Sequence, residues 1–299
     1  MRKFIISDIH GLGNVYYSIM NYLDNIKKEE EIELYINGDL FNRGIESTKI
    51  LIDVYKRIKN QENIIYLGGN HELLMHQFYQ KYLEKGSYSY FNDWYDNGGY
   101  IIDDELYVYF DYDFKKLMKV VNYVSNLKIY HKFKETIKDK QIVLVHAKCP
   151  ETVNDICDIR IKDDNKLVFS SVWSRNYDDI PLFSIFIPEK IKLGNDDYFT
   201  IIGHTPNKNK YGYFYNKEDN YLNIDGGCAG YACGLFEYDH IPLVEVKDNY
   251  LQILTFNNNN EIIYGNYFDG EKNIPYTDLE LSNARKYLNS ELKVKKYVF

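Results

Sequence analysis

Three short apolar runs in the first 67 residues are separated by two segments with helical periodicity. The runs, at residues 3–7, 32–37 and 63–67, are rich in Ile, Leu and Tyr and end in polar turns, as buried strands do. The segments between them, residues 14–28 and 47–59, carry apolar side chains at the spacing of one helical face. This strand–helix order is typical of parallel βαβ units and predicts an α/β fold.

The rest of the chain follows a different pattern. Residues 73–135 are predicted to be a mainly helical insertion, and residues 150–195 a loop-rich stretch. Further strands are predicted at residues 141–145, 198–202, 221–224, 244–247, 252–256 and 261–267, the last three antiparallel, with a closing helix at 278–294. No linker rich in Pro, Gly or Ser interrupts the chain, so residues 1–299 are predicted to form one domain, with residues 243–299 as its C-terminal strands and helix.

One stretch of the predicted insertion is unusually aromatic. Residues 87–100 contain several Tyr residues together with Trp94. We interpret this stretch as core or lid packing, and the alternative is that it lines a substrate groove.

Charge and composition limit the partners of the chain. It carries 36 basic and 44 acidic side chains, a formal net charge of −8, which argues against nucleic-acid binding because phosphate contacts need a basic surface. No run approaches the roughly eighteen apolar residues of a membrane span, so no membrane partner is expected. The start of the chain has no secretory signal, and a cytoplasmic location is predicted. The four cysteines lack CxxC spacing and are interpreted as reduced thiols.

Polar side chains follow six of the predicted strands. The sequences at these strand ends are SDIHG (7–11), GDLFNRG (38–44), GNHE (69–72), VHA (145–147), GHTP (203–206) and DGG (225–227). Each alone is explained by helix capping or a turn, but neither requires histidine after several separate strands. Ligands of open α/β sheets bind at this edge, and Asp, Asn and His donors together suit two adjacent divalent transition metals. The candidate ligands are Asp8, His10, Asp39, Asn70, His146 and His204.

The order SDIHG, GDLFNRG, GNHE, VHA, VWSR and GHTP resembles the phosphoprotein phosphatase branch of the calcineurin-like metallophosphoesterases, and most closely its bacterial and phage serine/threonine phosphatases. The resemblance spans residues 7 to about 230. It implies a β-sandwich of two mixed sheets flanked by helices. It also implies that Asp8, His10 and Asp39 hold a first metal, and that Asp39 bridges to a second metal completed by Asn70, His146 and His204. Manganese is the metal expected from the family, with iron or zinc as alternatives.

The resemblance also implies a mechanism. Two cations about 3.5 Å apart make a bridging hydroxide available near neutral pH, and this hydroxide attacks phosphorus. Arg43 and Arg175 bind the phosphate oxygens through their guanidinium forks, and Asn70 also contacts the substrate. For Arg175 the alternative is a surface ion pair. His71 is not expected to bind metal; as the general acid it protonates the leaving alkoxide.

One catalytic position departs from the family pattern GDxxDRG. Its second aspartate hydrogen-bonds the catalytic histidine, and here that position is Asn42. An amide oxygen can still hold the imidazole of His71, but it stabilises the imidazolium less than a carboxylate does. Three explanations stay open: slow turnover of alkyl phosphates, a preference for good leaving groups, or an engineered change from aspartate.

The predicted activity is that of a metal-dependent phosphatase acting on phosphoproteins or phosphorylated small molecules. A dinucleoside tetraphosphate hydrolase is the first alternative, because such enzymes share the scaffold and also lack the second aspartate. A catalytically impaired metal-binding regulatory module is the second alternative, and Asn42 is its only support.

Overall fold

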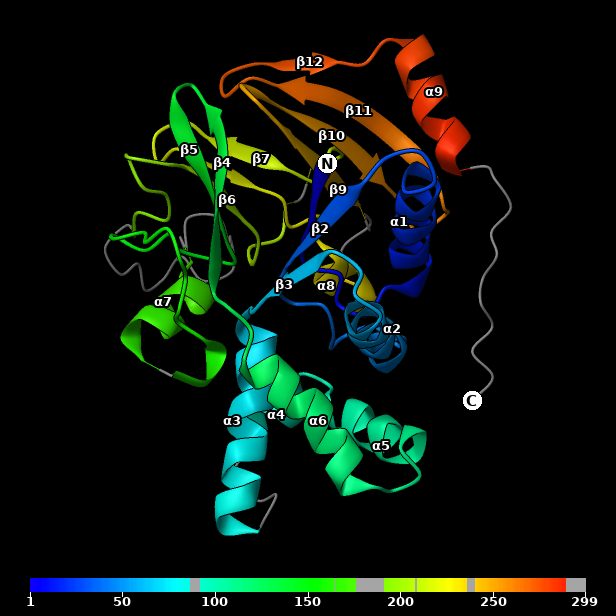
Figure 1. Cartoon of the computed structure of the whole chain (residues 1–299), viewed down its shortest axis with the longest axis vertical. Helices are drawn as coiled ribbons and strands as arrows, with labels where there is room; N and C mark the ends of the chain where they lie inside the picture. Colours follow the sequence, from blue (N-terminus) through cyan, green and yellow to red (C-terminus); the bar gives the residue numbers. More distant parts are fainter. Residues whose placement is uncertain (87–91, 164, 176–190, 208, 236–239, 289–299) are drawn as a thin grey trace.

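Two mixed β-sheets pack face to face and carry helices on their outer sides (Figure 1). The computed structural model describes residues 1–86, 92–163, 165–175, 191–207, 209–235 and 240–288. The predicted architecture of two mixed sheets flanked by helices is confirmed. None of the helices in these ranges has both the length and the apolar character of a membrane span.

The first sheet has seven strands in the order β12-β11-β10-β9-β1-β2-β3. Its parallel part is β1 (Arg2–Ile6), β2 (Ile32–Asn37) and β3 (Ile64–Leu67), joined by helices α1 (Gly13–Ile26) and α2 (Ser47–Lys59). Its antiparallel part is β9 (Ile241–Lys247), β10 (Tyr250–Phe256), β11 (Ile262–Phe268) and β12 (Asn273–Pro275). The predicted βαβ units and the later antiparallel strands are therefore both present.

The second sheet has five strands in the order β4-β5-β6-β8-β7. The inner strands β5 (Lys140–Val145), β6 (Phe199–Ile202) and β8 (Tyr221–Asn223) are parallel. The edge strands β4 (Tyr130–Ile137) and β7 (Phe214–Asn216) run antiparallel to their neighbours. Because β5 and β6 are parallel to one another, the chain leaves both at the same edge of the sheet.

Alternate residues of the central strands face two separate apolar cores. In β1, Phe4 and Ile6 pack toward the helices, whereas Ile5 packs between the two sheets. In β2, Leu34 belongs to the helix-side core and Tyr35 to the core between the sheets. Both faces of these strands are buried, which explains why they read as continuous apolar runs in the sequence.

Four helices form a lobe at one end of the molecule, which we call the helical lobe (Figure 1). They are α3 (Asn70–Lys85), α4 (Asn92–Asp96), α5 (Gly99–Tyr109) and α6 (Phe114–Ser125). The remaining helices are α7 (Lys166–Trp173), α8 (Cys228–Ala232) and α9 (Asp278–Leu288), with a 3₁₀ turn at Ile161–Asp163. Trp94 of α4 is fully buried, in agreement with core packing, while residues 87–91 of the aromatic stretch lie outside the described residues.

The insertion predicted at residues 73–135 is mainly helical, but its predicted end was wrong. The helical insertion ends at Ser125, and residues 130–135 belong to strand β4 instead. The stretch 150–195, predicted to be loop-rich, also contains α7. Strands β7 and β12 were not predicted, and the last residues of the predicted helix 278–294 lie beyond the described chain. The single-domain assignment and the cytoplasmic location stay predictions; all four cysteines are free thiols.

Candidate metal centre

Loops from both sheets bring the six candidate ligands to one edge of the sandwich. We call these residues, Asp8, His10, Asp39, Asn70, His146 and His204, the strand-end rim. They follow strands β1, β2, β3, β5 and β6. None of the six exposes more than 3% of its surface. The sequence prediction that they lie together is therefore met, while their role as metal ligands stays a prediction.

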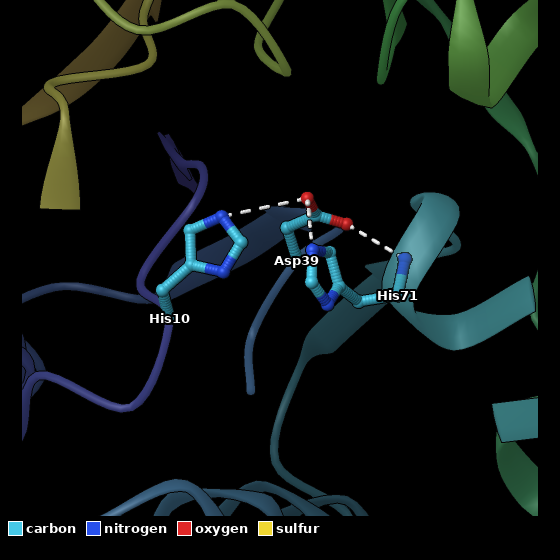
Figure 2. A group of neighbouring side chains, drawn as sticks. All are labelled: His10, Asp39 and His71. Atoms are coloured by element: carbon cyan, nitrogen blue, oxygen red, sulfur yellow. Dashed lines mark hydrogen bonds and ion pairs between the residues drawn. The ribbon is translucent and has the colours of Figure 1, made fainter. Parts of the chain in front are cut away.

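The carboxylate of Asp39 lies at the centre of the rim. Its Oδ2 is 3.4 Å from His10 Nε2 and 3.8 Å from His71 Nε2 (Figure 2). Its Oδ1 is 3.4 Å from His146 Nε2 and accepts a hydrogen bond from the backbone N–H of His71 at 3.1 Å. Side-chain donor atoms therefore form two groups that share Asp39, one with His10 and His71 and one with His146 and His204.

The remaining two rim residues, Asn70 and Asp8, each lie beside a histidine of one of these groups. Asn70 Oδ1 is 3.2 Å from His146 Nε2. Asp8 Oδ1 is 4.0 Å from His10 Nε2 and accepts from the backbone N–H of His204 at 3.0 Å. Asp8 thus links the loop after β1 to the loop after β6, one from each sheet.

The backbone of the rim is strained. Four rim residues, Asp8, His10, Asp39 and His204, have positive φ angles of 55°, 45°, 51° and 69°. Non-glycine residues adopt this left-handed region at a cost, and such residues cluster at functional sites. Gly38, at φ 79°, lies beside them, and a Cβ atom there would be 2.8 Å from Nδ1 of His146.

The ring of His146 is oriented as a metal ligand requires. Its Nδ1 lies 2.8 Å from the carbonyl oxygen of Asn37, and because a carbonyl only accepts, Nδ1 carries the hydrogen. In the neutral ring the lone pair of Nε2 then faces oxygens of Asn70 and Asp39. Burial alone lowers the pKa of His146, but the carboxylates of Asp39 and Asp8 raise it to about 10. The surrounding carboxylates therefore favour a positive charge at Nε2 of His146, which either a proton or a metal cation can supply.

His204 has two partners that require opposite tautomers. Its Nε2 is 2.8 Å from Arg175 Nε, which can only donate, and 3.3 Å from the carbonyl oxygen of Trp173, which can only accept. Its buried Nδ1 has no hydrogen-bond partner among the described residues. A metal at Nδ1 needs a lone pair there, so the fitting tautomer donates from Nε2 to Trp173.

Two carboxylates at this edge, Asp8 of the rim and the neighbouring Asp225, lack enough positive charge. Burial alone would raise the pKa of Asp39 too, but the surrounding histidines hold it well below its usual value. Burial, together with Asp225 and Asp39, raises the pKa of Asp8 well above its usual value. Burial raises the pKa of Asp225, at the end of β8, to about 6. Clustered buried carboxylates of this kind repel each other unless cations lie among them. The donor set and its charge therefore fit divalent cations.

Asn42 holds the ring of His71 as the sequence analysis proposed. Nδ1 of His71 lies 3.0 Å from Oδ1 of Asn42. The amide Nδ2 of Asn42 is buried without a hydrogen-bond partner in the described chain. Burial lowers the pKa of His71 to about 3, and the charge of Arg43 contributes to this shift.

The two predicted phosphate-binding arginines differ in their surroundings. Arg43 is exposed on the loop after β2, and its Nη2 donates to Oδ1 of Asn97 at the start of the turn before α5. Arg175 follows α7 and is partly buried against His204. Burial and the charge of Arg175 lower the pKa of His204, and burial and the charge of Arg43 lower that of His10, so both arginines act electrostatically on the rim.

Sequence analysis missed a buried carboxylate that supports the rim. Glu72, fully buried in α3, accepts hydrogen bonds from the backbone N–H groups of Asp39, Leu40 and Gly69. It also accepts from the hydroxyl of Tyr66. Glu72 thereby ties the loop after β2 to the start of α3. Its place in GNHE was visible, but a first-turn acidic residue is also explained by helix capping.

Comparison with known proteins agrees with this geometry. A family model described as calcineurin-like phosphoesterase matches residues 1–234. The symmetrical bis(5'-nucleosyl)-tetraphosphatase of Wigglesworthia glossinidia brevipalpis is 33% identical over 81 residues, which are 27% of this chain and only 28% of that relative's length.

Two solved structures share the fold. One is a protein serine/threonine phosphatase from Saccharomyces cerevisiae, with a TM-score of 0.54 at 13% identity over 86% of this chain and 80% of that one. The other is a mutant of a cold-active protein tyrosine phosphatase, with a TM-score of 0.50 at 15% identity over 92% and 80%. At such identities the likeness concerns the fold and not the substrate. Because the matched family model extends from β1 to the end of α8 and covers every residue of the strand-end rim, the chain belongs to the calcineurin-like phosphoesterase family, whose members are metal-dependent hydrolases of phosphoric esters.

Proposed function

We propose that this chain is a dimetal-dependent phosphomonoesterase that acts as a serine/threonine protein phosphatase. The observation that carries the proposal is the position of Asp39. One of its oxygens faces His10 and the other faces His146, so a single carboxylate serves two adjacent sets of donors.

Each set of donors is assigned to one cation. Asp8, His10 and Asp39 hold the first, and Asp39, Asn70, His146 and His204 hold the second, as their proximity supports. Two bound divalent cations supply Lewis-acid polarisation of a phosphoryl oxygen and acidify water at neutral pH. Manganese is the metal we propose; mixed carboxylate and imidazole donors also accept iron or zinc.

The chain's own residues bind and orient the phosphate. Arg43 and Arg175 provide guanidinium N–H groups, and these match phosphate oxygens in geometry and charge. In the structure Arg175 donates to His204, the contact that does not fit a metal at Nδ1. With His204 donating to Trp173 instead, Arg175 is available to the substrate.

His71 is placed to transfer a proton to the leaving oxygen. Asn42 accepts from Nδ1, which orients the ring with Nε2 toward the rim, 3.8 Å from Asp39. Burial lowers the pKa of His71 to about 3, so the ring is neutral when no substrate is bound. A bound phosphate dianion beside it favours the protonated form, which then donates to the alkoxide.

The surface beside His204 supports a protein substrate. The ring of Trp173 lies edge-on to that of His204, with centroids 6.0 Å apart, and Phe169 stacks on Trp173 at 6.2 Å. Phe169 is more than half exposed, so an apolar surface leads from solvent to the rim. Together with the GNHE sequence and with Trp173 ahead of Arg175, this surface favours a peptide segment over a small polar ester.

A dinucleoside polyphosphate is the second candidate substrate. The local match to a symmetrical bis(5'-nucleosyl)-tetraphosphatase and the Asn at position 42 favour it. That match covers little more than a quarter of either chain, so it carries less weight than the aromatic surface.

A substrate panel with added Mn²⁺ tests the proposal. It contains phosphoserine and phosphotyrosine peptides, an aryl phosphate and diadenosine tetraphosphate, each assayed with and without a chelator. We expect metal-dependent release of phosphate from the phosphoserine peptide. Hydrolysis of the dinucleotide alone would instead favour the second candidate. No turnover of any substrate with Mn²⁺, Fe²⁺ or Zn²⁺, despite bound metal, would identify a regulatory module.

A further inference from the structure

Beyond the start of α3, the helical lobe contacts the loop after β2 at two further points. Oδ1 of Asn97, in the turn between α4 and α5, accepts a hydrogen bond from Nη2 of Arg43. The ring of Trp94 in α4 lies edge-on to that of Phe41, with centroids 6.1 Å apart at 85°. Phe41 and Arg43 flank Asn42, so the lobe contacts both sides of the residue that orients His71.

The turn that carries Asn97 is rigidly built. Gly98 has φ 90°, a conformation that favours glycine, and a Cβ atom on Gly99 would lie 2.1–2.4 Å from the indole of Trp94. The indole is fully buried and its Nε1 donates to Asp103 at 3.2 Å. The Trp94 ring therefore fills the space left by the missing side chain at Gly99 and fixes the turn above it.

The amide of Asn97 is also fixed. Its Nδ2 donates to the carbonyl oxygen of Asp93 at 2.6 Å, so its Oδ1 is the atom directed to Arg43. Among the residues that the structure describes, Asn97 is the side chain that accepts a hydrogen bond from the guanidinium group of Arg43. An exposed arginine loses much rotamer freedom when it binds a ligand, and a partner that holds it beforehand reduces this cost. A neutral acceptor does so without offsetting the positive charge that phosphate needs.

We infer that Asn97 is a positioning residue that orients Arg43 for the phosphate group, so that the helical lobe contributes to phosphate affinity. This inference rests on the proposed function, because it takes Arg43 as a phosphate ligand. It concerns binding and not the chemical step, since the side chain of Asn97 is hydrogen-bonded to Arg43 and Asp93 and, within the described residues, to no rim residue.

The test compares Asn97→Ala with a matched variant, Asn126→Ala. Asn126, at the end of α6, also donates from Nδ2 to the carbonyl oxygen four residues earlier, at 2.7 Å, but within the described part of the chain it makes no hydrogen bond to an arginine. Each variant is made in the wild-type chain and in an Arg43→Ala chain. The Kd of inorganic phosphate is measured by calorimetry on the metal-loaded protein, and kcat and KM are measured on an aryl phosphate.

We expect Asn97→Ala to raise the phosphate Kd and the KM together by about fivefold, with kcat changed less than about twofold. Asn126→Ala should match the wild type. In the Arg43→Ala chain, Asn97→Ala should have no further effect, because the arginine that it orients is gone. The same loss in that chain, or an unchanged Kd in the wild-type chain, would overturn the inference. A protein that binds phosphate in this Asn97-dependent way but hydrolyses nothing would refute the proposed function alone.

Discussion

The strand-end rim and the helical lobe bury charge in opposite ways. The rim gathers carboxylates and imidazoles whose lone pairs face one another, and several of its residues occupy left-handed backbone. In the part of the lobe away from the rim, the carboxylate of Asp103 accepts hydrogen bonds from the hydroxyl of Tyr79 and the indole N–H of Trp94. The rim is therefore built for added positive charge. In the lobe, burial raises the pKa of Asp103 and favours the neutral acid, even though the two hydrogen bonds favour the ionised carboxylate. Function requires the first arrangement, and packing alone accounts for the second.

The same substitution in both regions tests this contrast most strongly. Asp39→Asn leaves one oxygen where two groups of donors need one each, and an amide carries no charge. We expect a fall in kcat/KM of at least about a thousandfold and loss of bound metal measured by plasma mass spectrometry. Asp103→Asn, the equivalent change in the lobe, should retain both metals and most of the activity. Full activity of Asp39→Asn with two bound metals would end the assignment of Asp39 as the shared ligand.

A substitution confined to the lobe should affect stability and leave the metals in place. In Gly99→Ala the added methyl group would overlap the ring of Trp94, which is enclosed on all sides. We expect the free energy of unfolding in urea to fall by about 2 kcal/mol, with the metal content unchanged. Tyr100→Ala, at an exposed neighbouring position, is the control and should change stability much less. Unfolding curves of Gly99→Ala that coincide with those of the wild type would contradict this account of the turn.

Restoring a carboxylate beside His71 should act on the rim alone. In Asn42→Asp the carboxylate accepts from Nδ1 of His71 and stabilises the protonated ring. We expect kcat on a phosphoserine peptide to rise about tenfold. The aryloxide of an aryl phosphate departs without being protonated, so kcat on aryl phosphates should change less than about twofold. Equal effects on the two substrates would show that position 42 does not act through the general acid.

The pH dependence of stability should reveal the neutral acid in the lobe. Burial raises the pKa of Asp103 to about 7 from an ordinary value of 3.8. A raised folded-state pKa means that its contribution to stability is complete below about pH 4 and is lost as the pH rises through 7. Relative to Asp103→Asn, the wild type should therefore lose on the order of 1 kcal/mol per pH unit across this window.

Chemical unfolding at several pH values measures that difference, and the wild-type minus variant comparison cancels the rim carboxylates. Asp104→Asn, a change at the exposed neighbour, should follow the wild-type curve. Parallel curves for wild type and Asp103→Asn would show that Asp103 titrates at its ordinary pKa.

Local periodicity predicted most strands and both crossover helices of the first sheet, and β4 shows where it failed. The buried residues of β4 include Tyr130, Phe133 and Ile137, at spacings of three and four that resemble a helix. The pairing of β4 with β5 shifts register between Lys132 and Thr136. Such an irregularity interrupts the two-residue alternation, so the strand loses the pattern by which it could be recognised.

The candidate site was predictable in its residues but not in its contacts. The histidines and acids at the strand ends stood out because capping and turns do not need that chemistry. Glu72, by contrast, looks like an ordinary first-turn residue until its hydrogen bonds to Asp39 and Leu40 are seen. Nothing in the sequence near Asn97 indicates that it contacts Arg43, which is 54 positions away.

By itself the sequence determined the donor types, their order along the chain and the strand ends on which they lie. Only the tertiary structure decided that loops from two different sheets meet, that each oxygen of Asp39 faces a different histidine, and that the helical lobe holds Arg43. The reason is physical: strand and helix patterns arise from neighbours a few residues apart, whereas these contacts depend on how sheets pair and pack across long stretches of chain.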